Sequence, residues 1–159
     1  MEREEVIRRC YDFAKAIGLA VEERTIAGKT FTPGITIEKN KLVVDREQLK
    51  YPGDLLHEAG HIAVLTEAQR EGLDGDATVG DKATEGYELG VLCWSYFAAQ
   101  KAGIPPEAVF HPDGYKGQSD WLLENFRNKK YIGLPLLQWM KIAEKTTEGE
   151  VRIVNWLRS

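Results

Sequence analysis

Three residues in the sequence have the types and spacing needed for metal chemistry. His57, Glu58 and His61 form the pattern His-Glu-x-x-His within His57-Glu58-Ala59-Gly60-His61. On a helix, residues four apart lie one turn from each other on the same face, so both imidazoles can bind one ion. Glu58 then lies where its carboxylate can reach a water molecule. This pattern is typical of metal-assisted hydrolysis, in which zinc lowers the pKa of a water to about 7 and the glutamate accepts its proton.

The apolar neighbours of the two histidines favour a metal site over a pair of solvated side chains. Leucines occupy positions 55–56, and an apolar run follows at 62–65. Histidines within such a helix need polar partners, because burying an unpaired polar group costs free energy. The sequence therefore predicts Zn²⁺ bound by His57 and His61, with Glu58 as the catalytic base.

A third protein ligand is required, and the next predicted helix offers two acids. Glu85 and Glu88 are three residues apart, so they share a helix face. We favour Glu88 as the ligand, because it lies deeper in the apolar run, and Glu85 as a residue that orients a ligating histidine. Two alternatives stay open: Glu85 is the ligand, or both acids face solvent.

The loop at 110–117 holds two candidate catalytic side chains, His111 and Tyr115, among proline and glycine residues. Such loops often place functional side chains over a rigid scaffold. Hydrolysis of an acyl bond passes through an oxyanion, which a donor opposite the metal would stabilise. The alternatives are that His111 bonds a backbone group in a tight turn before Pro112 and that Tyr115 packs against the preceding helix.

The elements that position these residues follow from the hydrophobic pattern. Apolar residues at helical spacing predict an amphipathic helix ending near Gly18. Two short apolar runs at 35–37 and 42–44 flank a polar turn and predict a hairpin. Helices are expected at about Pro52–Ala68 and Lys82–Ala102, with a loop at Glu71–Asp81 between them. The fold class is therefore α+β: a small antiparallel sheet at Ala20–Val44 packed on the metal-binding helix, and a mostly helical C-terminal half.

This arrangement resembles the small gluzincin metallopeptidases of the zincin type, and is most similar to the ImmA/IrrE group. The resemblance extends from Gly34 to about Phe97 and is carried by the hairpin, the His-Glu-x-x-His helix and an acid on the following helix. It implies that His57, His61 and Glu88 bind zinc and that Glu58 is the base. It also implies a peptide or protein substrate.

Composition sets limits on the other functions. The chain has 159 residues, which suits a single domain over 1–159, and its formal net charge of −4 gives no basic surface for nucleic acid. The cysteines Cys10 and Cys93 are expected to be free buried thiols, and the four tryptophans are expected in the core. The N-terminus lacks a signal-peptide pattern and no apolar run approaches about 18 residues, so we expect a cytoplasmic protein without a membrane span. The sequence does not indicate an oligomeric state.

Two functions that use the metal site remain in competition, and a helical domain without a metal site is a third alternative. The first is a zinc metallopeptidase-like hydrolase. The second is a catalytically inactive zinc-binding domain with a regulatory or protein-interaction role. Glu58 favours the first, because a structural zinc site has no need of a base beside its ligand and is usually closed by four protein ligands.

Overall fold

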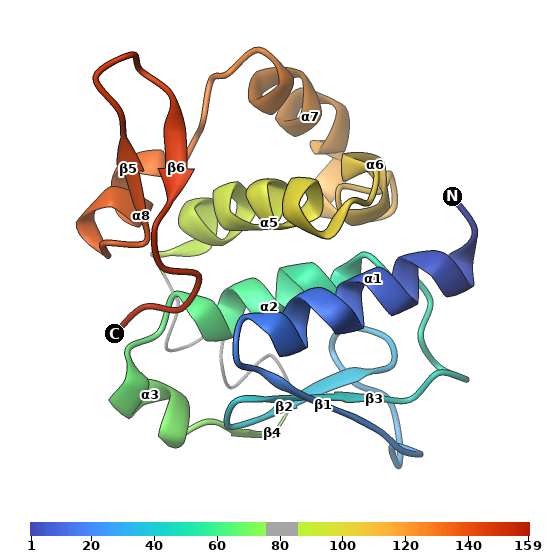
Figure 1. Ribbon diagram of the computed structural model, residues 1–159. Coiled ribbons are helices and arrows are strands. Elements are labelled where there is room, and N and C mark those ends of the chain that lie inside the picture. The colour runs from blue at the N-terminus through green and yellow to red at the C-terminus, as the bar shows by residue number, and fades with distance from the viewer. Residues whose placement is uncertain (76–85) are drawn as a thin grey trace.

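A mixed sheet, two helical layers and a C-terminal layer stack in that order (Figure 1). The C-terminal layer is formed by residues 106–153. The computed structural model describes residues 1–75 and 86–159. Helices α1 (Arg3–Ala16) and α2 (Asp54–Ala63) cover one face of the sheet, and α5 (Glu88–Ala102) packs on their other side. The described part of the chain is thus α+β, as predicted, with α2 in the interior.

The sheet is mixed, so the prediction of an antiparallel sheet is wrong in one strand pair. Strands β2 (Ile35–Glu38) and β3 (Lys41–Val44) form the predicted antiparallel hairpin, but β1 (Ala20–Glu23) pairs with β3 in parallel. Between β1 and β2, the chain is tied to Asp45 at the end of β3, because the Asp45 carboxylate accepts a hydrogen bond from the Ile26 amide at 3.0 Å. This longer connection allows β1 to lie beside β3 rather than beside β2.

The predicted loop at Glu71–Asp81 contains the fourth strand of this sheet. Strand β4 (Asp74–Gly75) pairs antiparallel with β2, so the order is β1-β3-β2-β4. Residues 76–81 of the predicted loop lie outside the described residues.

Helix α2 is shorter than predicted. It ends at Ala63, and Thr66 starts a separate helix, α3 (Glu67–Glu71), through a capping box with Gln69. The Thr66 hydroxyl accepts a hydrogen bond from the Gln69 amide, and the Gln69 side chain accepts one from the Thr66 amide. This reciprocal capping stabilises a new helix start, which the apolar pattern of 62–65 does not reveal.

Helix α5 is buried along most of its length. Every residue from Gly90 to Ala99 is buried, because α1 and α2 lie on one side and the C-terminal layer lies on the other. A helix that is apolar all round is typical of such an interior position. The predicted helix start at Lys82 lies outside the described residues. Within them, Gly86 has a φ of 92° and α5 begins at Glu88.

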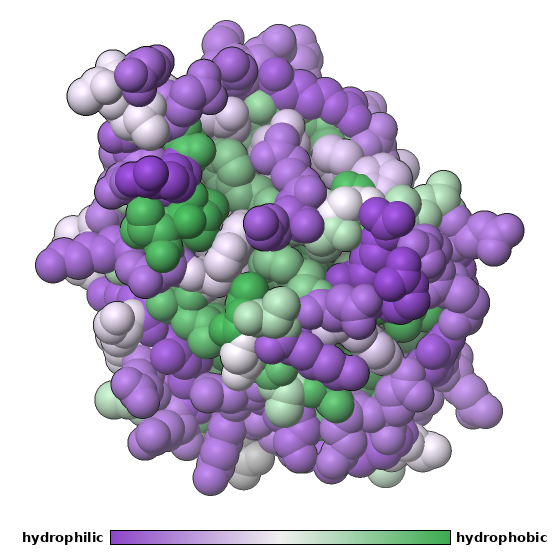
Figure 2. Space-filling model, viewed as in Figure 1, coloured by the Kyte–Doolittle hydropathy of each residue, from purple (hydrophilic) through white to green (hydrophobic). Residues whose placement is uncertain are grey.

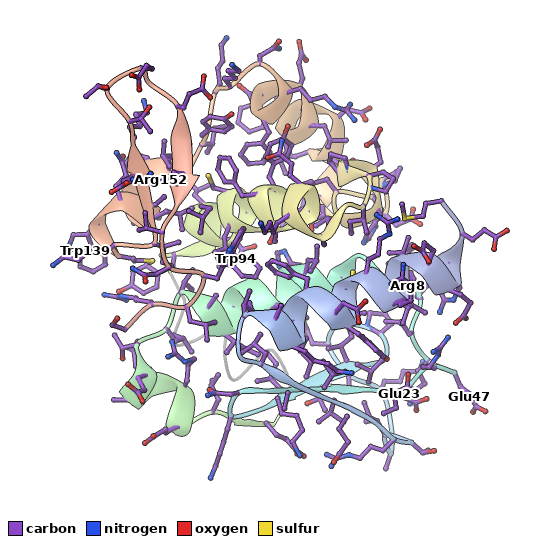
Figure 3. All side chains as sticks on the ribbon, in the orientation of Figure 1. Arg8, Glu23, Glu47, Trp94, Trp139 and Arg152 are labelled. Atoms are coloured by element: carbon purple, nitrogen blue, oxygen red, sulfur yellow. The ribbon has the colours of Figure 1, made fainter. Side chains whose placement is uncertain are left out.

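Gly60 allows α5 to lie directly against α2. A Cβ atom at Gly60 would meet Val91 Cγ1 at 3.0 Å, Trp94 Cε3 at 3.1 Å and Ser95 Oγ at 3.3 Å. In Figure 3, Trp94 lies between α5 and the layer of α1 and α2. The absence of a side chain at Gly60 therefore sets the separation of the two helices.

The C-terminal half is mostly helical, as predicted. It contains α6 (Pro106–Val109), a 3₁₀ turn η1 (Tyr115–Gly117), α7 (Ser119–Arg127) and α8 (Leu134–Trp139). It closes with a hairpin of β5 (Ala143–Lys145) and β6 (Val151–Ile153).

The tryptophans divide between core and surface, so the prediction that all four are core residues is wrong. Trp94 is fully buried and Trp156 is partly buried against the core. Trp121 on α7 and Trp139 on α8 are more than half exposed, because they lie on the outward faces of covering helices. Trp139 lies at the outer edge of the molecule in Figure 3 and contacts the Arg158 guanidinium at 4.8 Å from its ring centroid.

The visible surface is mostly polar, and both cysteines lie in the interior. The face in Figure 2 is mainly hydrophilic, with smaller apolar areas between the polar side chains. Cys10 and Cys93 are free and buried, as predicted, and burial raises the pKa of each thiol to about 12. Among the described residues, no helix combines the length and the apolar character needed to cross a bilayer.

The contact between Gly60 and α5 predicts that Gly60→Ala destabilises the protein by about 1–3 kcal/mol, because the added methyl group overpacks a buried interface. Urea unfolding of the two proteins measures this difference. Gly72→Ala is the matched control, since a Cβ atom there meets only Gln69 O at 3.5 Å. Equal stability of Gly60→Ala and wild type would contradict the packing described here.

Candidate metal centre

Helix α2 places His57 and His61 on one face with their ring nitrogens together. His57 Nε2 and His61 Nε2 are 3.1 Å apart, and the two rings meet edge to face. His61 is 3% exposed, and the apolar side chains around it belong to the central core cluster. The spacing of the two histidines in the sequence therefore brings two potential metal-binding nitrogens together on one helix face.

Glu88 approaches this pair from the first turn of α5. One carboxylate oxygen, Oε1, lies 3.5 Å from His57 Nε2, and the other, Oε2, lies 3.5 Å from His61 Nε2. The three candidate ligand atoms lie within 4.8 Å of one another. In a tetrahedral zinc site with bonds of about 2.0–2.1 Å, ligand atoms are about 3.3 Å apart. The donor types and their separations thus fit a zinc ion.

Burial keeps both imidazoles in the neutral form that metal binding requires. Desolvation lowers the pKa of His57 to about 3, with further lowering by the charges of His61 and His111. Desolvation also lowers the pKa of His61 to about 4. At neutral pH each ring therefore has an unprotonated nitrogen that can bind a metal ion. Glu88, by contrast, has a side chain that is 52% exposed, so the centre has one solvent-facing side.

Glu58 lies on the same helix in an almost fully buried position. It is 2% exposed, and its Oε1 accepts a hydrogen bond from the Thr32 hydroxyl at 2.8 Å. Thr32 lies in the turn before β2 and forms an isolated bridge with Ile35. Sequence reasoning missed Thr32, and no local signal could have found it, because the contact joins residues 26 positions apart.

The loop at 110–117 packs against the N-terminal half of α2. His111 Nε2 lies 2.8 Å from Asp54 Oδ1, and both side chains are largely buried. Burial raises the pKa of Asp54, while the hydrogen bond and the charge of His111 oppose that change. The His111 ring also stacks on Tyr51 with centroids 3.8 Å apart. The Tyr115 hydroxyl lies 3.3 Å from His57 Nδ1. Sequence reasoning missed Asp54 and Tyr51 as partners of this loop.

The structure brings most of the predicted site residues together. His57, His61 and Glu88 converge, Glu58 is next to them on α2, and Tyr115 contacts His57 directly. The prediction that Glu88 lies deep in an apolar run is wrong: Glu88 is the first residue of α5 and its side chain is half exposed. Glu85 lies outside the described residues. The roles of His111 and Tyr115 as oxyanion donors stay predictions.

We compared the chain with protein-family models, with characterised proteins and with solved structures, and none of the three comparisons finds a match.

The buried contact between Asp54 and His111 predicts that His111→Ala destabilises the protein by about 3 kcal/mol, because it leaves a buried carboxylate without its partner. Urea unfolding at neutral pH measures the change. The double variant Asp54→Asn with His111→Ala removes the stranded charge and should be more stable than His111→Ala alone. If His111→Ala unfolds like wild type, the pair contributes nothing to stability.

Proposed function

We propose that this protein is a zinc-dependent hydrolase that cleaves peptide bonds, with His57, His61 and Glu88 as zinc ligands and Glu58 as the general base. The observation that carries the proposal is the triangle of two neutral imidazole nitrogens and one carboxylate, at separations of 3.1 and 3.5 Å. Acids and histidines that only face solvent do not need to converge at this spacing between two packed helices. A zinc site requires such convergence of its ligand atoms.

A zinc ion held at this centre would supply Lewis acidity, lowering the pKa of a water to about 7 and polarising a substrate carbonyl. Glu58 accepts a proton at its carboxylate, and Thr32 fixes one oxygen of that carboxylate through the 2.8 Å hydrogen bond. A general base must be held within hydrogen-bonding reach of the proton that it removes. The rigid α2 backbone and Thr32 together provide that orientation.

The choice of a peptide substrate rests on the resemblance to the small gluzincin metallopeptidases. The competing proposal, an inactive zinc-binding regulatory or protein-interaction domain, needs no base. The buried Glu58 supports the hydrolase, because a carboxylate at 2% exposure costs free energy to hold and has no structural role in binding the ion. The described residues also bring together three ligands rather than the four that usually close a structural zinc site.

The ligand assignment predicts that His57→Ala and His61→Ala each abolish stoichiometric zinc binding and lower the melting temperature of the zinc-loaded protein. A metal that binds only the folded state stabilises it by mass action. Metal analysis of the purified variants, together with thermal unfolding with and without zinc, measures both effects. Glu88→Ala should weaken zinc binding more than Glu85→Ala. Full zinc content in either histidine variant would refute the site.

The role of Glu58 predicts that Glu58→Gln retains zinc but lowers turnover by about 10²–10⁴-fold, the range for loss of a general base. The glutamine keeps an oxygen for Thr32, so the fold should be preserved. Turnover of a broad peptide library, read out by mass spectrometry, measures the change. Glu107→Gln is the matched control, since its carboxylate pairs with Arg127 on the surface. A zinc-loaded wild-type protein that cleaves nothing would favour the regulatory domain.

A further inference from the structure

The Tyr115 hydroxyl contacts the edge of the His57 ring that lies away from the metal centre. Its oxygen is 3.3 Å from Nδ1, whereas Nε2 of the same ring faces His61 and Glu88. The two aromatic rings meet at 77° with centroids 5.6 Å apart. A contact at Nδ1 cannot compete with a metal at Nε2, but it can decide which ring nitrogen holds the proton.

The backbone around Tyr115 is held in a conformation that side chains rarely adopt. Tyr115 and the following Lys116 have φ values of 60° and 52°, so two successive non-glycine residues lie in the left-handed region. Each costs about 1–2 kcal/mol relative to ordinary backbone. Strained residues of this kind persist only where the surrounding structure fixes them, and they cluster at functional sites.

One contact with α2 and the packing within the loop itself hold this strained turn in place. His111 binds Asp54 at the N-terminal end of α2, and the Tyr115 ring packs on Phe110 with centroids 5.3 Å apart. Gly114 leaves room for the His111 ring, because a Cβ atom there would meet His111 Cε1 at 3.1 Å. The loop is thus held before Tyr115 in the orientation that brings the Tyr115 hydroxyl to His57.

We propose that Tyr115 is a positioning residue for the zinc ligand His57: its oxygen accepts a hydrogen bond from Nδ1–H and so keeps the Nε2 lone pair directed at the ion. The proposal rests on the zinc site proposed above. Metal-binding histidines generally donate their second N–H to a partner that fixes ring orientation and tautomer. This partner is a neutral phenol rather than a carboxylate, because a tyrosine hydroxyl is protonated at neutral pH.

The test is the zinc affinity of Tyr115→Phe, measured on the full chain by competition with a chromophoric chelator. The phenylalanine keeps the ring packing and removes only the acceptor oxygen. Loss of such a partner typically weakens metal binding by 10–100-fold, so we expect a decrease of about that size with unchanged unfolding of the metal-free protein. Tyr51→Phe is the matched control, since the Tyr51 hydroxyl bonds Asp113 in the same loop without touching His57. It should leave zinc affinity unchanged.

A second measurement separates hydrogen bonding from packing. In the zinc-loaded wild type, the His57 Nδ1–H proton should exchange slowly with solvent in NMR spectra, because it is buried and bonded. In Tyr115→Phe the same proton should exchange rapidly. Equal zinc affinities of Tyr115→Phe and wild type, or a Nδ1–H proton that exchanges equally in both, would overturn the role of Tyr115 while leaving the zinc site intact. Absence of zinc binding by the wild type would instead refute the proposed function.

Discussion

The close contact of α2 with α5 at Gly60 is the constraint on which the candidate centre depends. Val91 and Ser95 on α5 pack where a side chain at Gly60 would otherwise lie. Glu88 lies one turn before Val91 on the same face of α5. Because Val91 packs against Gly60, the Glu88 carboxylate also faces α2, beside the adjacent turn. That turn carries His57 and His61 on either side of Gly60. The helix separation needed for packing is thus also the separation needed for a shared ligand set.

The polar side chains of α2 extend this constraint to distant parts of the chain. A buried helix with ionisable residues at four positions would be unstable if those residues lacked partners. Each of the four meets a partner outside α2, and the partners come from three segments: Thr32 before β2, Glu88 on α5, and His111 and Tyr115 in the loop after α6. The polar residues of one short helix therefore fix the placement of three remote segments, which an all-apolar helix would leave less well specified.

The sequence predicts those parts of this arrangement that are local. The His-Glu-x-x-His spacing and the hairpin at 35–44 depend on periodicity within a few residues, and both are confirmed as structural features. The parallel pairing of β1 with β3 joins residues far apart in the sequence, such as Ala20 and Lys41, and no local pattern predicts it. Thr32 is equally invisible, since nothing around it differs from an ordinary turn. Glu88 lies beside the two histidines, but its position depends on helix packing rather than on local hydrophobicity, and its role as a zinc ligand stays a prediction.

The C-terminal layer controls the site from both ends through two further glycines. A Cβ atom at Gly53 would meet the Ala108 carbonyl oxygen at 1.9 Å, so α6 packs directly against the start of α2. This contact lies beside Asp54 and sets the origin of the loop that carries His111 and Tyr115. At the other end, a Cβ atom at Gly133 would meet the Leu89 carbonyl oxygen at 2.0 Å, which seats the start of α8 on the first turn of α5. Leu89 directly follows Glu88. The C-terminal layer contributes no candidate zinc ligand among its described residues. It nevertheless fixes the backbone around Glu88 and the loop that contacts His57.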